Sequence, residues 1–266
     1  MRRTICSAAF AMVAALGLFA ASQPLSAQDQ ERQPLDDRTT ACNRVDNFGA
    51  GATQFNVCLS NEGNVTEIDA PAGFSQADLP EEGYQLCTVG ADYRDFGALG
   101  NNGWLAASVV QPTPGSIVGL VVTRKTTDNQ WQLKQTFGKS NAKREITITM
   151  ALKKLNSPIG GPVYLERWNG FNLDNDFLSG SIHDQTANSV TGRRIRGLSL
   201  TALTFGTTHF NAVGTNFNFG AQPGVCNAVS AASPTAFVDG AGYVTYSLPG
   251  FNTGETRTVK FAYRVY

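Results

Sequence analysis

Histidine and charge are both scarce in this 266-residue chain. Its two histidines are His183 and His209, and charged residues make up 16% of the sequence. The sequence contains no H-E-x-x-H, no G-x-S-x-G, no phosphate-binding glycine loop and no dinucleotide fingerprint. It therefore lacks the motifs that mark the common zinc peptidases, serine hydrolases and nucleotide-dependent enzymes. His209, in the strand-like stretch TTHFNAV, is predicted to be a structural histidine held by hydrogen bonds.

An excess of positive charge is also absent. The chain has 21 basic and 21 acidic residues, and loss of a leader that contains Arg2 and Arg3 would leave 19 basic residues and a net charge of −2. Nucleic-acid binding needs a basic surface that neutralises phosphates, so nucleic acid is not predicted as a partner. The one basic cluster, Arg193, Arg194 and Arg196, is short and predicts an exposed hairpin or an edge strand protected by charge.

The N-terminus has the pattern of a secretory signal peptide over residues 1–27. Two arginines precede the apolar run Ile5–Ala21, and small residues follow at Ser26 and Ala27. The run is not followed by a basic stop-transfer flank, so we expect cleavage near Ala27 and no transmembrane segment in the mature chain. The protein is predicted to be secreted or periplasmic.

Export changes how the cysteines are interpreted. The mature chain keeps four, and an even number in an oxidising compartment predicts two disulfides. Zinc sites usually have ligands two to four residues apart, and none of these cysteines is that close to another. Of the three possible pairings we favour Cys42 with Cys58 and Cys87 with Cys226. The first would pin the polar residues 28–41, which are predicted to be a loosely ordered arm.

Helical periodicity is absent after Cys42, and alternation of apolar and polar residues takes its place. The stretches REITITMALKK (144–154) and TRTVKFAYRVY (256–266) predict strands with one buried face. SIVGLVVT (116–123) has apolar residues on both faces and predicts a central, fully covered strand. About twelve strands are expected, which indicates a single domain over residues 42–266 with an all-β fold, a two-sheet antiparallel β-sandwich of jelly-roll-like type.

Three turn signals predict hairpins between neighbouring strands. They lie at Ser60–Gly63, at Thr126–Gln130 and at Asp239–Gly242. Each contains glycine, asparagine or aspartate, which supply the positive φ angles of tight turns.

The stretch FNLDNDFLSGSIHD, residues 171–184, concentrates oxygen-bearing side chains. Asn172, Asp174 and Asp176 alternate, so in an extended backbone they would share one side, and Asp184 could complete a shell of oxygen ligands of the kind that calcium prefers. Calcium is the only cofactor that the sequence indicates. A polar connection between strands and a catalytic carboxylate remain the alternatives for this stretch.

The three tryptophans are candidates for ligand binding. Trp104, Trp131 and Trp168 each lie within two residues of an asparagine, in NNGW, DNQW and RWNG. Exposed tryptophan beside amides can hold a sugar by stacking and hydrogen bonding. The same side chains could instead close the ends of a sandwich core.

Paired carboxylates could perform glycoside hydrolysis, which needs two acids on either side of the scissile bond. The candidate acids are Glu166, Asp174, Asp176 and Asp184. Their separation in space is not fixed by the sequence.

The leading functional prediction is a non-enzymatic exported protein that binds a glycan or a cell-surface protein through its loops. It depends on the missing catalytic motifs and the balanced charge. The alternative is a secreted β-sandwich hydrolase acting on polysaccharide. A structural subunit that assembles by strand addition ranks last, because residues 28–41 lack the alternating apolar residues of a donated strand. The ligand and the oligomeric state are left open.

Overall fold

The computed structural model describes residues 42–51, 54–70, 75–78, 82–96, 100–170, 181–193, 197–204, 206–214, 237–238 and 241–266. All of them fall within one compact unit of the chain, Leu35–Tyr266. The predicted signal peptide and arm, residues 1–41, lie outside the described residues and stay predictions. No helix in the described part is long and apolar enough to span a membrane.

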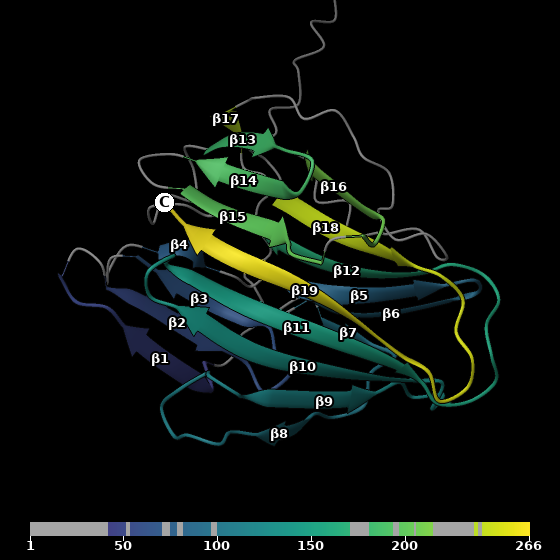
Figure 1. The fold of residues 1–266 in the computed structure, drawn as a ribbon. Coiled ribbons are helices and arrows are strands. Elements are labelled where there is room, and N and C mark those ends of the chain that lie inside the picture. Colours follow the sequence, from purple (N-terminus) through teal and green to yellow (C-terminus); the bar gives the residue numbers. More distant parts are fainter. Residues whose placement is uncertain are drawn as a thin grey trace, which may run out of the picture. The chain divides into compact units, whose positions relative to one another are not determined.

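The described residues form three antiparallel sheets (Figure 1). The nine-stranded sheet has the order β17 (Phe237–Val238), β13 (Ser181–Gln185), β14 (Ser189–Arg193), β15 (Gly197–Ala202), β19 (Thr256–Val265), β11 (Glu145–Lys154), β10 (Trp131–Ser140), β9 (Val121–Lys125) and β8 (Ser108–Val110). The six-stranded sheet has the order β16 (His209–Gly214), β18 (Ala241–Leu248), β12 (Val163–Gly170), β5 (Gly83–Thr88), β6 (Ala91–Phe96) and β7 (Gly100–Asn102). The four-stranded sheet has the order β1 (Arg44–Phe48), β2 (Phe55–Leu59), β3 (Val65–Asp69) and β4 (Ser75–Asp78).

The six-stranded and four-stranded sheets cover the same face of the nine-stranded sheet. The buried side chain of Gln135, on β10, accepts a hydrogen bond from Arg167 Nη1 on β12 at 2.8 Å. Its Nε2 donates to the backbone oxygen of Glu62, in the turn between β2 and β3, at 3.1 Å. The predicted all-β sandwich is thus confirmed.

The strand count exceeds the twelve expected, since the described part contains nineteen strands. Part of the difference arises from very short strands. Strands β7 and β8 have three residues each and β17 has two. Such lengths are too short for an alternating pattern to be recognised.

Alternation correctly predicts the central strands of the nine-stranded sheet. On β11, Ile146, Ile148, Met150 and Leu152 are all buried in the core, and on β19 the same holds for Val259, Phe261, Tyr263 and Val265. The intervening residues point to the other face, because successive side chains of a strand alternate. One face of these strands therefore builds the core and the other forms a polar surface.

The predicted central strand at 116–123 is wrong over 116–120 and in its position, since only residues 121–123 are in a strand, β9. Residues Ser116–Leu120 form turns, and the strand that follows, β9, is next to the edge strand β8. Ile117 and Leu120 are buried while Val118 is 49% exposed. Two apolar side chains are buried by a turn here. The sequence is therefore as rich in apolar residues as that of a covered strand.

Two of the three predicted hairpins are confirmed, and the third is wrong. Ser60–Gly63 joins β2 to β3, and Thr126–Gln130 joins β9 to β10. The strands on either side of Asp239–Gly242 do not pair with each other. Strand β17 pairs with β13 in the nine-stranded sheet, whereas β18 pairs with β12 and β16 in the six-stranded sheet.

Asn129 sets the geometry of the β9–β10 hairpin. Its φ is 56°, and its N–H donates to the Thr126 carbonyl at 2.9 Å. We expect Asn129→Ala to lower the free energy of unfolding by about 1 kcal/mol, because alanine is disfavoured in this left-handed conformation. Asn129→Gly should stay within about 0.5 kcal/mol of the parent, because glycine adopts positive φ readily. Urea unfolding of both variants checks this, and equal losses for the two would contradict the backbone explanation.

One predicted disulfide is present. Cys42 and Cys58 are bonded, with Cα atoms 5.4 Å apart, and they tie the chain just before β1 to β2. Cys87 is also disulfide-bonded. Cys226 lies outside the described residues, so its pairing with Cys87 stays a prediction.

A buried ion pair links the three sheets. Arg167 Nε, on β12, donates to Glu82 Oε1 at 2.5 Å, and both side chains are 0% exposed. Arg167 also donates to the Gly63 carbonyl at 3.0 Å. Tyr263 Oη, on β19, and the Val65 N–H both donate to the Glu82 carboxylate, at 2.8 and 2.6 Å. Charges buried in this way are tolerated only when they are paired and hydrogen-bonded.

Candidate functional site

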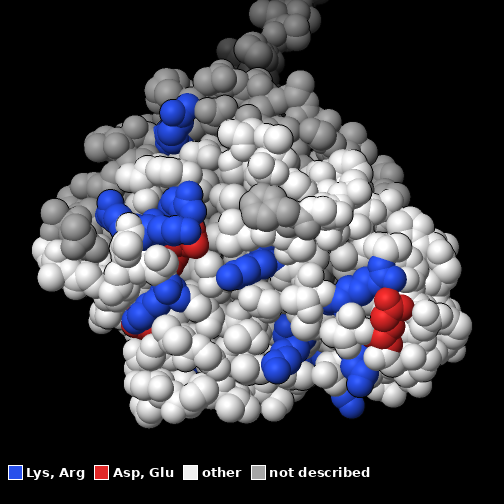
Figure 2. Space-filling view, in the orientation of Figure 1, with Lys and Arg blue, Asp and Glu red and all other residues white. Residues whose placement is uncertain are grey.

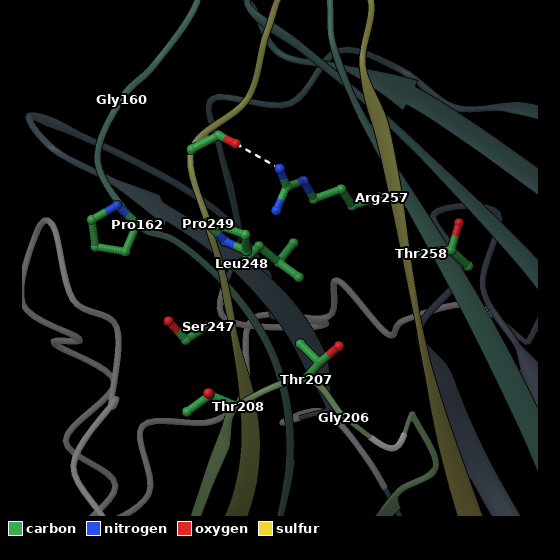
Figure 3. A pocket seen from close by; sticks show the side chains of 11 residues that line it. Gly160, Pro162, Gly206, Thr207, Thr208, Ser247, Leu248, Pro249, Arg257 and Thr258 are labelled. Atoms are coloured by element: carbon green, nitrogen blue, oxygen red, sulfur yellow. Dashed lines mark hydrogen bonds between the residues drawn. The ribbon is translucent and has the colours of Figure 1, made fainter.

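An open pocket of about 780 Å³ lies where the two large sheets end (Figure 3). It is built from the segment before β12, the segment before β16, the end of β18 and the start of β19. Hydroxyls dominate its polar lining. The lining residues are Gly160, Pro162, Gly206, Thr207, Thr208, Ser247, Leu248, Pro249, Gly250, Arg257 and Thr258.

Arg257 is the one charged residue among those that line this pocket. Its Nη2 donates to the Gly250 carbonyl at 2.8 Å, and its Nε donates to Glu255 Oε1 at 2.9 Å. The guanidinium also lies over the Phe251 ring, 4.9 Å from its centroid. These contacts hold the guanidinium in a defined orientation beside four hydroxyl side chains. The pocket can thus donate several hydrogen bonds to a polar ligand.

The pocket shares one residue, Ser247, with the outer face of the six-stranded sheet. Ser247 lines the pocket and, on β18, points away from the core residue Tyr246. Thr245 is two residues away on the same face, about 7 Å along the strand. It is paired in register with Glu166 on the neighbouring β12. A buried carboxylate therefore lies on the same face as Ser247, outside the lining of the pocket.

Glu166 is enclosed and oriented by its neighbours. Its side chain is buried, and Thr245 Oγ1 donates to Glu166 Oε2 at 2.6 Å. Burial raises the pKa of Tyr243, also on β18, and the charge of Glu166 raises this pKa further. The phenol next to this carboxylate therefore stays protonated over the neutral pH range and can donate a hydrogen bond.

A second acid lies on the same face. Asp92, on β6, is in the cross-strand row that contains Ser247, since Ser247 pairs with Tyr164, Tyr164 with Cys87 and Cys87 with Asp92. Burial raises the pKa of Asp92, although a hydrogen bond from Gln85 and the charge of Arg94 lower it to a smaller extent. An acid with a raised pKa can stay protonated closer to neutral pH.

Gln85, on β5, lies between the two acids. It pairs in register with Glu166, and its Nε2 donates to Asp92 Oδ1 at 2.5 Å. Its Oε1 is buried and accepts no hydrogen bond from any residue in the described part of the chain. A buried acceptor without a partner costs about 1–3 kcal/mol.

The three tryptophans are all buried. Trp104 is 3% exposed and packs against Tyr84 and Tyr93, and Trp131 is 1% exposed and packs against Phe251. Trp168 is 4% exposed, and its ring is stacked on that of Tyr243 on the outer face that carries Glu166. Trp168 is therefore the tryptophan that the structure brings to the candidate site. Sugar stacking by any of the three stays a prediction.

The predicted calcium ligands fall largely outside the described residues. Asn172, Asp174 and Asp176 lie in residues 171–180, which the structure does not describe, and Asp184 is on β13. The described residues hold no group of three or more metal-ligating side chains. Calcium binding stays a prediction.

His209 matches its predicted structural role. Its Nε2 lies 3.0 Å from the Ala187 carbonyl and 3.1 Å from Asn188 Oδ1, and its Nδ1 lies 3.2 Å from the Thr207 carbonyl. These contacts join β16 of the six-stranded sheet to the β13–β14 turn of the nine-stranded sheet.

No family model and no curated protein matches the chain in sequence. Structural comparison gives a bacterial glucoamylase complexed with acarbose, with a TM-score of 0.59 and 8% identity over 85% of this chain. The chain spans 32% of the glucoamylase chain, about a third of its length. A heparan sulfate lyase mutant from Pedobacter heparinus matches with a TM-score of 0.46 and 10% identity, over 84% of this chain and 35% of that one. That score is too low to support an argument.

The glucoamylase match contradicts the leading functional prediction. The sequence led us to expect a non-enzymatic exported protein, because it contains no recognisable catalytic motif. The fold is instead similar to that of part of a bacterial glucoamylase. That correction favours the alternative prediction, a hydrolase acting on polysaccharide. A missing local motif does not exclude an enzyme, because two acids on one sheet face can lie far apart in sequence.

Asp92 and the Arg257 pocket were missed by sequence reasoning. Asp92 stands in ADYRDF, where an alternating strand with acids on both faces looks like an ordinary solvated edge. Only the pairing of β6, β5 and β12 puts Asp92 on the face of Glu166. The pocket is assembled from four separate segments, so no local pattern marks it.

Proposed function

We propose that this chain is a carbohydrate-active hydrolase that cleaves glycosidic bonds in a polysaccharide. The observation that carries the proposal is the pair of acids, Glu166 and Asp92, on one sheet face beside a hydroxyl-lined pocket. The fold shared with part of a glucoamylase supports it. Sugar units would be held in the pocket by Arg257 and the Thr and Ser hydroxyls.

The two acids take different roles. Asp92, whose pKa is raised by burial, is the proposed general acid that protonates the leaving oxygen. Glu166, held by Thr245, is the proposed base that takes a proton from the attacking water. Gln85 Nε2 would donate a hydrogen bond to Asp92, and Gln85 Oε1 would accept one from a sugar hydroxyl. Glu166 is fully buried, so the proposal requires this face to open before a substrate reaches it.

The spacing favours hydrolysis with inversion. Strands β12 and β6 are two strand spacings apart, and the two acids are offset by two residues, so their Cα atoms are about 12 Å apart. Retaining enzymes need carboxyl groups about 5–5.5 Å apart, and inverting enzymes use about 6.5–9.5 Å, which leaves room for water. The wider arrangement suits these positions better.

Turnover of purified protein on a panel of polysaccharides tests the proposal. Neutral α-linked and β-linked glucans, xylan and polygalacturonate would each be incubated with the protein, and new reducing ends would be measured. We expect reducing ends from at least one polysaccharide, at a rate that heat-inactivated protein does not reproduce. Folded protein that releases none from any of them would overturn the proposal. Proton NMR of the first product would then report the anomeric configuration.

A further inference from the structure

The outer face of the nine-stranded sheet carries exposed positive charge. Side chains that alternate with the core residues of β9, β10, β11 and β19 point to this face. The cations among them are Lys125, Lys134, Lys153, Lys260 and Arg264. Figure 2 shows Lys and Arg spread over this face and acidic side chains in few places.

Acidic residues do not neutralise this face. Glu145, the one acid among the outward residues of these four strands, receives a hydrogen bond from Arg264 Nε at 3.0 Å. None of the four lysines forms an ion pair with a described residue. Several acids of the chain are buried in pairs instead, including Asp46, Glu82 and Asp95. The balanced net charge thus conceals a cationic surface.

The lysines are arranged across neighbouring strands. Lys125 pairs in register with Gln132, and Gln132 pairs with Lys153, so the two lysines lie about 10 Å apart across three strands. Lys134 lies one row further along β10. Lys260, on β19, pairs with Thr149 and extends the charged area across the fourth strand. A long, flat polyanion could therefore contact several lysines at once.

Hydroxyl groups occupy the space between these charges. The outward threonines of the four strands are Thr123, Thr136, Thr147, Thr149, Thr256 and Thr258. These strands present no aromatic side chain outward. Neutral sugars are commonly held by stacking on aromatic rings, and single-stranded nucleic acids are held by stacking of their bases. The face thus lacks the usual means of binding either.

We propose that this face binds an acidic polysaccharide, whose carboxylate or sulfate groups contact the lysines and whose hydroxyls contact the threonines. The choice of a polysaccharide over other polyanions rests on the proposed function, and the charge and hydroxyl pattern is independent of it. This face lies on the opposite side of the sandwich from the candidate catalytic site, so a chain that contacts both would pass around the edge of the sheets. The substrate class is then a uronate-containing or sulfated polysaccharide.

Binding by affinity electrophoresis tests the proposal with four probes: polygalacturonate, dextran sulfate, neutral dextran and double-stranded DNA. Wild-type protein should be retarded by polygalacturonate or dextran sulfate and not by neutral dextran, and added salt should weaken the retardation. The variant with Lys125, Lys134, Lys153 and Lys260 changed to Gln should lose affinity by about tenfold or more. The matched variant with the same lysines changed to Arg should keep it, because the charge is retained.

The two polyanionic probes separate carboxylate from sulfate recognition. Equal retardation of the wild type and the Lys→Gln variant would overturn the proposal, as would tighter binding to DNA than to either acidic polysaccharide. Glu67→Gln, on β3 of the four-stranded sheet, should bind like the wild type, because it lies outside both the lysine face and the catalytic site. Turnover of a neutral polysaccharide with no binding to either acidic one overturns this inference alone. Binding to an acidic polysaccharide with no turnover of any probe overturns the hydrolase proposal alone.

Discussion

Arg167→Met should lower the free energy of unfolding by about 3–5 kcal/mol. Removing one partner of a buried ion pair leaves the other charge without compensation in a medium of low dielectric constant. Here the remaining charge is Glu82, which would keep only the donors Tyr263 and Val65. The Gly63 carbonyl and Gln135 Oε1 would each lose a donor as well. Domains of this kind are stable by only about 5–15 kcal/mol, so the loss takes a large share.

Arg264→Met is the matched control. Arg264 also pairs with a carboxylate, that of Glu145, but its side chain is 33% exposed. Water reaches Arg264 although Glu145 is only 5% exposed, so we expect a loss of about 1–2 kcal/mol, smaller than that for Arg167. Chemical denaturation of both variants, monitored by tryptophan fluorescence, measures the difference. Similar small losses would show that the Arg167 pair contributes no more than a surface pair.

The pH dependence gives an independent check on Arg167→Met. Burial raises the pKa of Glu82 above its ordinary value of 4.5, and the charge of Arg167 opposes that rise. Without Arg167 the pKa of Glu82 should rise further. The folded state then binds more protons than the unfolded state in the range between 4.5 and the raised pKa. The stability lost by the variant should therefore be greatest above the raised pKa and shrink as the pH falls toward 4.5. The double variant Arg167→Met, Glu82→Gln should recover part of the loss at neutral pH.

Alternation could predict the fold because it follows directly from strand geometry. REITITMALKK and TRTVKFAYRVY gave the correct buried faces of β11 and β19 because one face of each packs on the core. The same reasoning failed at residues 116–123, where a turn buries Ile117 and Leu120. It also failed at Asp239–Gly242, because a turn signal does not reveal that the chain changes sheets there.

The candidate site could be predicted only in part. Glu166 was one of four candidate acids, but whether it can act depends on which strands lie beside β12. The pairing of β12 with β5 and of β5 with β6 is long-range and leaves no trace in composition. The lysine face could not be predicted from the charge count either, because that count does not report where the charges lie. A net charge of zero cannot distinguish acids buried in pairs from lysines spread over a surface.

Glu166→Gln should lower kcat on the polysaccharide that the protein cleaves by about 10²–10⁴-fold, the range expected for loss of one acid–base group. The glutamine is nearly the same size, and its amide oxygen can still accept the hydrogen bond from Thr245. We therefore expect the fold and KM to change little. Glu67→Gln, an exposed acid on β3 of the four-stranded sheet, removes the same charge elsewhere and should leave kcat unchanged. Initial rates across a range of substrate concentrations separate the two constants. Wild-type kcat in Glu166→Gln would remove this residue from the mechanism.

The pH profile distinguishes a catalytic carboxylate from one that merely shapes the face. A general acid must be protonated, so activity falls as the pH rises through its pKa. A general base must be ionised, so activity falls as the pH drops through its own. Burial raises the pKa of Asp92 above 3.8. In Asp92→Asn, the activity that remains should therefore no longer decrease as the pH rises. Glu166→Gln should remove the fall on the acidic side instead. If both variants kept a bell-shaped pH profile and lost activity by the same factor, the two acids would have a structural role and not a catalytic one. Selective loss of one limb in each variant assigns the acid and the base separately.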